Sequence, residues 1–464
     1  MKHYRYEKEP RQSGKVKSRS SVPLKKDGSH SGISLKTQPR TRARSSPDQI
    51  VEAAGFDQDQ NPVADRRALI CLSHLRWDFV YQRPQHLLTR SARADRVFFV
   101  EEPIFGEDGR ARLEVSERAG GICVVVPHLP NNLREKEIAA TEQRLLDELF
   151  VEHKIGEHLL WYYTPMALDF TRHLKPRCVI YDCMDELSLF KGAPPALKER
   201  EAELFAEADL VFTGGQSLYE AKRELHPRVY AFPSSIDAAH FAQARTLTED
   251  PADQAGIPHP RLGFCGVLDE RMDLELLSGI ACTRPDWHLV MIGPIVKINP
   301  ADLPQRPNIH YLGPKSYKNL PAYLAGWEVA LLPFARNNST RFISPTKTPE
   351  YLAAGRPVVS TSIRDVVRPY GKQKLVHIAD TTDEFVRSIE SAMNEDAAER
   401  VRRVDAFLAE TSWDLTWQRM DELIEGVIDA RRTTLATNTR PTVLQRPATL
   451  AVTGGIDRAG NLVA

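Results

Sequence analysis

The chain has 464 residues, of which 42% are hydrophobic and 27% are charged. At about 100–200 residues per domain this length predicts two or three domains, and the composition excludes collagen, coiled coils and disulfide scaffolds. No uncharged apolar run reaches the ~18–20 residues of a membrane-spanning helix, and the N-terminus lacks the apolar stretch of a signal peptide. We therefore expect a cytoplasmic protein.

The formal net charge of zero conceals a basic segment and an acidic remainder. Residues 1–46 hold 13 Lys and Arg against three acids, which leaves +10 there and −10 elsewhere. A segment this polar cannot bury enough surface to fold, so we predict a disordered tail over 1–66. The stretch over 433–464 is low in charge and shows no hydrophobic pattern, so we predict a second tail there. The basic tail is either a solvated extension or an attachment to the inner face of an anionic membrane; nucleic acid fits less well, because interleaved aromatic residues are missing.

Short apolar runs alternate with helical patterns in two series, which is typical of parallel strands in βαβ units. The first series of expected strands is 68–74, 96–102, 122–127, 159–164, 178–182, 210–215 and 229–233, with helices at 134–154 and 195–208. The second series is 261–267, 288–293, 308–313, 329–334, 357–361 and 375–380, followed by helices at 382–394, 398–410 and 412–431.

These two series predict an α/β protein with two facing, doubly wound, Rossmann-like domains. We expect the N-terminal domain over 67–235, a linker over 236–260 and the C-terminal domain over 261–411. A final helix over 412–432 is expected to cross back to the N-terminal domain. The six cysteine residues form no C-x-x-C pair, which favours reduced thiols over disulfides or a zinc site.

In such sheets ligands bind at the carboxyl ends of the strands, so the loops there hold the candidate residues. After the first strand come Arg76, Trp77, Gln82, Arg83 and Gln85, which we predict to bind a polar or anionic acceptor. The alternative is that the apolar residues of this loop pack and its polar residues are solvated.

Two carboxylates follow the fifth strand of the first domain. Asp182 and Asp185 stand at or beyond its end, where a carboxylate can take the proton of a sugar hydroxyl as a general base. The alternatives are a helix cap or a solvated acid. No G-x-G-x-x-G occurs in the first turn of this domain, which argues against a dinucleotide oxidoreductase.

The second domain offers groups suited to a phosphorylated ligand. Arg271 precedes a helix and is placed to neutralise a diphosphate, or else it pairs with Glu270 or Glu275. A Ser- and Thr-rich loop with Ser344 and Thr346 leads to Lys347 and Glu350, which combine phosphate donors with a carboxylate for ribose hydroxyls.

Three segments carry a resemblance to a known family. ISPTKTPEYLAAGRPVVST at 343–361 resembles the nucleotide-sugar-binding segment of GT-B-fold glycosyltransferases, family-4-like (glycosyl transferases group 1). WDFVYQRPQHLLTR and VIYDCMDE resemble the bacterial subgroup found with teichuronic acid and other cell-surface polysaccharide synthesis. The resemblance covers most of 68–432, and the two runs in two separate domains are together specific.

The resemblance implies that the acceptor binds the N-terminal domain and the nucleotide sugar the C-terminal one. Glu350 would bind the nucleotide ribose, with Thr348 and Tyr351 nearby, while Arg271 and Lys347 would contact the donor diphosphate. The donor is then a co-substrate, uridine-based by expectation, and no cofactor is implied.

Three positions depart from the family pattern. Phe342 stands where the family's E-x7-E pair needs a Glu, Val267 replaces the usual Arg after Gly266, and Met184 replaces a His. These changes favour Asp185 as the base of an inverting reaction over retaining chemistry. No D-x-D metal site stands out, so we expect a metal-independent transfer.

The leading prediction is a glycosyltransferase that acts on a cell-surface polysaccharide or lipid-linked acceptor. A nucleotide-sugar epimerase or hydrolase on the same fold is the first alternative, and a degenerate, non-catalytic nucleotide-sugar-binding scaffold is the second. The residues in the acceptor loop favour transfer over the first, and Arg271, Lys347 and Glu350 favour donor binding over the second. The sequence leaves the sugar, the acceptor and the oligomeric state open.

Overall fold

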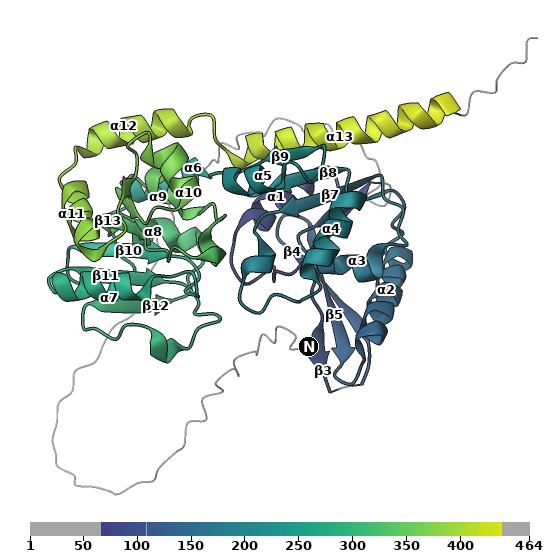
Figure 1. The fold of residues 1–464 in the computed structure, drawn as a ribbon, viewed down its shortest axis with the longest axis horizontal. Coiled ribbons are helices and arrows are strands. Elements are labelled where there is room, and N and C mark those ends of the chain that lie inside the picture. Colours follow the sequence, from purple (N-terminus) through teal and green to yellow (C-terminus); the bar gives the residue numbers. More distant parts are fainter. Residues whose placement is uncertain (1–65, 108, 439–464) are drawn as a thin grey trace, which may run out of the picture. The chain divides into compact units, whose positions relative to one another are not determined.

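The computed structural model describes residues 66–107 and 109–438, with side chains up to residue 434. Residues 1–65 of the tail predicted over 1–66, which include the basic segment 1–46, and residues 439–464 of the tail predicted over 433–464 lie outside the described residues. Within the described ranges the chain forms two mixed α/β units, each built on its own sheet (Figure 1). The predicted α/β class with parallel sheets is confirmed.

The first sheet has the strand order β3-β5-β2-β1-β6-β7-β8-β9, with β4 paired to β5. Its strands are β1 (Ala68–Ser73), β2 (Arg96–Glu101), β3 (Ile104–Gly106), β4 (Arg112–Arg118), β5 (Ile122–Pro130), β6 (His158–Tyr162), β7 (Cys178–Cys183), β8 (Leu210–Thr213) and β9 (Val229–Ala231). β1 is buried along its whole length between β2 and β6, as its continuous apolar run predicts. The strand order reverses at β1, which makes its carboxyl end the switch point of this sheet.

One strand of this sheet departs from the expected parallel pattern. β4 pairs antiparallel with β5, from Arg112 opposite His128 to Arg118 opposite Ile122. Sequence reasoning missed β4 because it carries four charged side chains and is half exposed at the edge of the sheet, so it lacks the apolar run of a buried strand.

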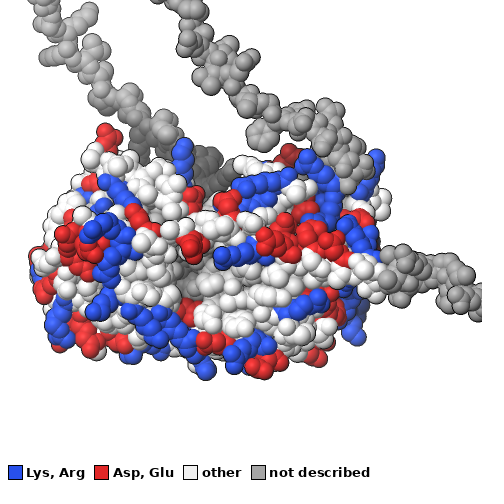
Figure 2. Space-filling view, turned by 90° about the horizontal axis from the view of Figure 1, so that it is seen from above, with Lys and Arg blue, Asp and Glu red and all other residues white. Residues whose placement is uncertain are grey.

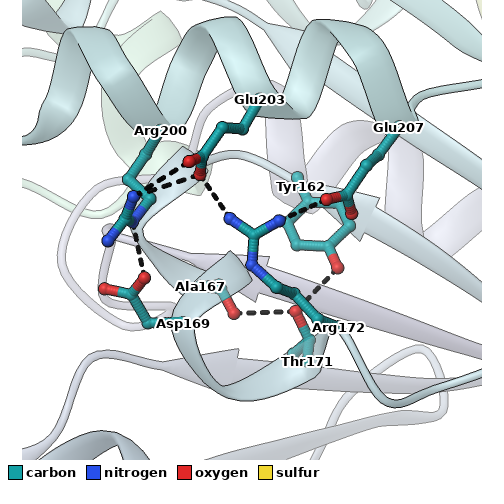
Figure 3. Close-up of polar contacts among 8 residues, drawn as sticks. All are labelled: Tyr162, Ala167, Asp169, Thr171, Arg172, Arg200, Glu203 and Glu207. Atoms are coloured by element: carbon teal, nitrogen blue, oxygen red, sulfur yellow. Dashed lines mark hydrogen bonds and ion pairs between the residues drawn. The ribbon is translucent and has the colours of Figure 1, made fainter. Parts of the chain in front are cut away.

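Helices α1 (Arg83–Ser91), α2 (Glu135–Glu152), α3 (Leu168–Thr171), α4 (Leu197–Glu207) and α5 (Gln216–Lys222) connect the strands. Figure 3 shows how α3 and α4 are linked by charge: Arg172 binds both Glu203 and Glu207, and Arg200 binds Asp169 and Glu203. These side chains are partly exposed, so each ion pair contributes about 0–1 kcal/mol to stability. The ion pairs connect α3 and α4 at the protein surface.

The predicted linker 236–260 contains helical structure that its acidic, loop-like sequence did not indicate. α6 (Ala238–Ala242) has Asp237 as its N-cap, and the carboxylate of Asp237 accepts a hydrogen bond from the backbone N–H of His240. Ile236 and Phe241 are buried in the core of the second sheet. The linker therefore belongs to the packing of the second unit.

The second sheet is fully parallel, with the order β12-β11-β10-β13-β14-β15. Its strands are β10 (Arg261–Cys265), β11 (His288–Ile292), β12 (Ile309–Gly313), β13 (Val329–Leu332), β14 (Val358–Ser360) and β15 (His377–Ile378), and its helices are α7 (Leu274–Thr283), α8 (Leu320–Ala325), α9 (Lys347–Ala353), α10 (Arg364–Val366), α11 (Thr382–Met393) and α12 (Ala397–Leu408). The order reverses at β10, so the loops after β10 and β13 lie at this sheet's switch point.

The last helix, α13 (Trp413–Asn438), contacts α1 and β7 of the first unit (Figure 1). Its residues Trp413, Met420, Ile424 and Ile428 are buried in the core on one face of the first sheet. The helix runs seven residues beyond the predicted end at 431, where the Thr433 and Thr434 hydroxyls donate to the carbonyls of Asp429 and Ala430. The tail predicted from Thr433 is therefore wrong for residues 433–438.

Candidate functional site

The first component of the candidate site is His74, which follows β1 at the switch point of the first sheet. Its Nδ1 lies 3.1 Å from the carbonyl oxygen of Tyr163, and because that oxygen can only accept, Nδ1 carries the proton. Burial lowers the pKa of His74 to about 4. Near neutral pH the ring is therefore uncharged, and its Nε2 offers a lone pair.

The second component is Asp185, which lies just beyond β7. Burial raises the pKa of its carboxyl to about 6, although the nearby Arg271 opposes this shift. Asp269 and Lys297 also act on this carboxyl. Burial therefore brings the pKa of Asp185 toward neutral pH, as in many general bases, while Arg271 and Lys297 of the second unit favour its charged form.

The loop after β10 supplies the third component, an arginine held by an aspartate. The Nε and Nη2 atoms of Arg271 lie 3.0 and 2.7 Å from Asp269 Oδ2, and both side chains are partly or fully buried. The guanidinium carbon of Arg271 and the ammonium of Lys297 lie 5.7 and 5.0 Å from the ring centre of Phe190, a residue of the first unit. Two cations thus gather close to Asp185.

The fourth component is the Lys347–Glu350 pair at the start of α9. Lys347 Nζ lies 2.5 Å from Glu350 Oε2, and burial raises the pKa of Glu350 while Lys347 works against that shift. Thr348 Oγ1 and the hydroxyl of Tyr317, which interacts electrostatically with Glu350, are buried and have no hydrogen-bond partner among the described residues. Buried groups without partners are costly, so this part of the site retains hydrogen-bonding capacity for a ligand.

The remaining predicted donor-site residues lie near this pair. Tyr351 is fully buried, accepts from the backbone N–H of Cys265 at 2.7 Å and donates to its carbonyl at 3.2 Å. Its hydroxyl ties α9 to β10, so the geometry gives it a structural role. Ser344 and Thr346 lie in the loop before α9, where the Ser344 carbonyl accepts from Ser234 Oγ at 3.3 Å. Ligand binding by these three residues stays a prediction.

The residues of the predicted acceptor loop form hydrogen bonds and ion pairs with other residues of the protein. Arg76 binds Glu101 at 2.8 Å, and the amide of Gln85 donates to the Trp77 carbonyl at 2.6 Å. Gln82 donates its backbone N–H to the Gln85 side chain at 2.9 Å. Arg83 binds Asp182 through Nε and Nη2 and donates Nη1 to the Phe232 carbonyl at 2.7 Å.

Trp77, Arg83 and Gln85 are buried, so no face of them is open to an acceptor. The hydrogen bonds and ion pairs of these residues hold the β1–α1 loop in place. The alternative stated above gave that structural role only to the apolar residues of the loop. Acceptor binding by this loop stays a prediction that the geometry does not support.

Three residues of the candidate site were not predicted from the sequence: His74, Phe190 and Lys297. His74 could have been found, because it directly follows a strand that the apolar run identified. Phe190 and Lys297 have no such signal, since their place depends on contacts between the two units. In residues 66–107 and 109–438 no three or more His, Cys, Asp or Glu side chains group as a metal site would, and no described helix is long and apolar enough to span a bilayer.

Comparison with known proteins gives a consistent result. Residues 259–395 match the family model described as glycosyl transferases group 1. Over 299 residues the chain is 24% identical to the "Putative teichuronic acid biosynthesis glycosyltransferase TuaH" of Bacillus subtilis (strain 168), which is 60% of this chain and 74% of that protein.

Among solved structures, sucrose-phosphate synthase from Thermosynechococcus elongatus has a TM-score of 0.58 at 13% identity, with 80% of this chain and 100% of that chain covered. The α,α-trehalose 6-phosphate synthase of Burkholderia multivorans has a TM-score of 0.56 at 13% identity, with 80% and 98% covered. At such identities the two structures show a shared fold, the GT-B architecture.

Proposed function

We propose, from the premise that residues 259–395 are a glycosyl transferases group 1 domain, that this glycosyltransferase moves a sugar from a nucleotide-diphosphate donor to a cell-surface saccharide or lipid-linked acceptor. The observation that carries the proposal is the gathering of Arg271 and Lys297 close to Asp185, with the Lys347–Glu350 pair at the neighbouring strand end. The name of the Bacillus relative supports an acceptor in surface polysaccharide synthesis. We take the donor to be a UDP-sugar.

The proposed chemistry assigns each charged group a step. The bond between the anomeric carbon and the donor's phosphate oxygen breaks, and the nucleoside diphosphate leaves with the electron pair. Arg271 and Lys347 stabilise the charge that develops on this leaving group, and Glu350 binds the ribose hydroxyls. Because two cations serve the leaving group, the proposal calls for no metal ion, and we expect turnover to survive EDTA.

The acceptor hydroxyl must lose a proton as its oxygen bonds to the anomeric carbon. We assign that proton to Asp185, whose raised pKa makes it a competent base near neutral pH. A base on the acceptor side suits inversion at the anomeric carbon, and NMR of the product's anomeric proton tests this assignment. His74 is the alternative base, because its uncharged ring also carries a free lone pair.

The donor assignment is tested by nucleotide binding to the full chain. Uridine, guanosine and adenosine diphosphates and their sugar conjugates are titrated by calorimetry and thermal shift, where a hundredfold excess over Kd raises stability by about 2.7 kcal/mol. We expect a selective uridine signal that weakens at least tenfold in Lys347→Ala.

Lys175→Ala, an exposed lysine outside the candidate site, is the matched control and should bind like the wild type. If Lys347→Ala retains full nucleotide affinity, the donor site is assigned to the wrong residues. If no nucleotide binds the wild-type chain, the proposed function is wrong.

We further propose that the protein works at the inner face of the membrane through residues 1–46, whose charge is +10. On the face that Figure 2 presents, basic and acidic side chains are interspersed, so that face has no field of one sign to attract a bilayer. Deleting residues 1–46 should abolish sedimentation with anionic liposomes at low salt. Equal sedimentation of the two chains would contradict this role.

A further inference from the structure

The described residues form a cavity of about 590 Å³ whose lining contains none of the residues assigned to the proposed chemistry. Its walls come from the segment after β7, from α4 and α5, and from the loop before α9. The lining residues are Glu186, Ser188, Leu189, Lys198, Glu201, Ala202, Phe205, Lys222, Leu225, Arg341 and Phe342. The volume is that of a small-ligand site.

The inner part of the cavity is a fixed polar cluster. Lys222 Nζ lies 2.7 Å from both Glu186 Oε2 and Glu201 Oε2, and all three side chains are largely buried. Tyr181 donates its hydroxyl to Glu201 at 2.8 Å, and Ser188 donates to Glu186 at 2.7 Å. The two carboxylates are therefore held in place, with Lys222 offsetting their charge.

Two further cations line the cavity, and unlike Lys222 they are not paired with a carboxylate of the described residues. Lys198 on α4 and Arg341 in the loop before α9 are exposed, and within the described residues neither forms an ion pair. The guanidinium carbon of Arg341 lies 5.1 Å from the ring centre of Phe342. Because the inner carboxylates already share Lys222, these two outer cations are available to an anion.

Phe342 and Phe205 add apolar surface to the lining. Phe342 comes from the second unit yet packs against the core cluster of the first sheet that contains Phe205. Aromatic rings give a pyranose a flat apolar surface for its C–H face, while carboxylates and hydroxyls accept its O–H groups. The lining thus combines sugar-binding features with a surplus of positive charge.

In the chain, several lining residues stand next to residues of the candidate site. Glu186 directly follows Asp185, and Arg341 and Phe342 belong to the loop that leads into Lys347. We propose that this cavity is the acceptor subsite and that it takes a sugar carrying an acid group, either a carboxylate or a phosphate. This inference rests on the proposed transferase function, and it relocates the acceptor from the β1–α1 loop to the α4–α5 side.

The test is ligand binding to the full chain, followed by NMR saturation transfer and calorimetry at low salt. Glucuronate, glucose 6-phosphate and glucose are the probes, so the first two distinguish a carboxylate from a phosphate. We expect at least one acidic sugar to bind ten times more tightly than glucose, and 0.5 M NaCl to remove the difference. Equal binding of all three probes would overturn the proposal.

Variants then locate the binding site. The double variant Lys198→Gln with Arg341→Gln should lose the preference for acidic sugars, whereas Lys175→Gln should retain it. Ala202 is an exposed residue of α4 that lines the cavity, so Ala202→Trp should block all three sugars without disturbing the fold. Ala206→Trp, on the same helix but outside the lining, is its control. Unchanged binding in both cavity variants would overturn the assignment.

UDP titration of the same samples separates this inference from the proposed function. UDP affinity should be equal in the wild type and all cavity variants. A chain that binds UDP but shows no preference for acidic sugars refutes the acceptor subsite alone. A chain that binds acidic sugars in the cavity but no nucleotide refutes the proposed transferase and leaves a binding site for acidic sugars.

Discussion

Asp182 and Asp185 stand three residues apart at the end of β7, yet their surroundings differ completely. Asp182 is fully buried and receives three contacts of 2.9 to 3.1 Å from Arg83. Among the described residues Asp185 has no such partner, and Arg271, Lys297 and Asp269 act on its carboxyl only through their charges. The same residue type at the same strand end is thus a structural group in one case and a poised acid–base group in the other.

This difference shows what a functional carboxylate requires. Asp182, whose two carboxylate oxygens are both held by the buried Arg83, contributes to the fold. A charge that is partly buried without a dedicated partner is poised between its two protonation states, which is the condition for moving a proton.

The largest expected effect is on turnover. Asp185→Asn removes the base but retains its shape, so kcat should fall by about a hundred- to ten-thousandfold. KM for the donor should change little, because Asp185 is not assigned to nucleotide binding. Steady-state kinetics with the selected UDP-sugar checks this, and near-full turnover of the variant would exclude Asp185 as the base.

The next effect concerns stability at the neighbouring aspartate. Arg83→Ala leaves the buried Asp182 without its partner and should cost about 3–5 kcal/mol of unfolding free energy. Urea denaturation followed by circular dichroism measures it. Because the penalty comes from the unpaired charge, adding Asp182→Asn should restore part of the loss. A loss of less than ~1 kcal/mol of unfolding free energy in Arg83→Ala would show that the buried Asp182 does not depend on Arg83.

A third effect is the pH dependence of catalysis. Since a base works only when deprotonated, kcat/KM should be nearly constant above about pH 7, reach half of that value at the Asp185 pKa of about 6 and fall about tenfold per unit at lower pH. His74, with a pKa of about 4, would instead leave activity intact down to about pH 4. The position of the acid limb therefore decides between the two bases.

The smallest effect is a gain in stability. The folded-state pKa of Asp185 lies above its value in the unfolded chain, so its ionisation destabilises the folded protein at neutral pH. Asp185→Asn should therefore raise the unfolding free energy by about 2–3 kcal/mol at pH 7, and the gain should vanish below about pH 3, where the carboxyl is protonated in both states. If Asp185→Asn were less stable than the wild type at pH 7, ionised Asp185 would not destabilise the folded protein.

The sequence predicts a large part of this picture, for identifiable reasons. Continuous apolar runs predicted β1, β7 and β10 and thereby placed Asp185 and Arg271 at strand ends. It could not tell Asp182 from Asp185, because that distinction depends on Arg83, which lies ninety-nine positions away in the chain. The hydrogen bonds of Tyr351 to Cys265 and the packing of Phe342 on the first sheet are equally non-local. Local patterns identify elements and their ends, whereas partners depend on the folded chain.

α13 has a consequence for the order of folding. Its apolar residues complete one face of the first sheet, and it reaches that sheet through pairs such as Arg67 with Glu425 and Arg90 with Asp414, more than three hundred positions apart. During synthesis the N-terminal half emerges first, so this face stays open to water until nearly the whole described chain has been made. The first unit is therefore expected to depend on chaperones until α13 arrives, and a chain that ends before Trp413 should aggregate.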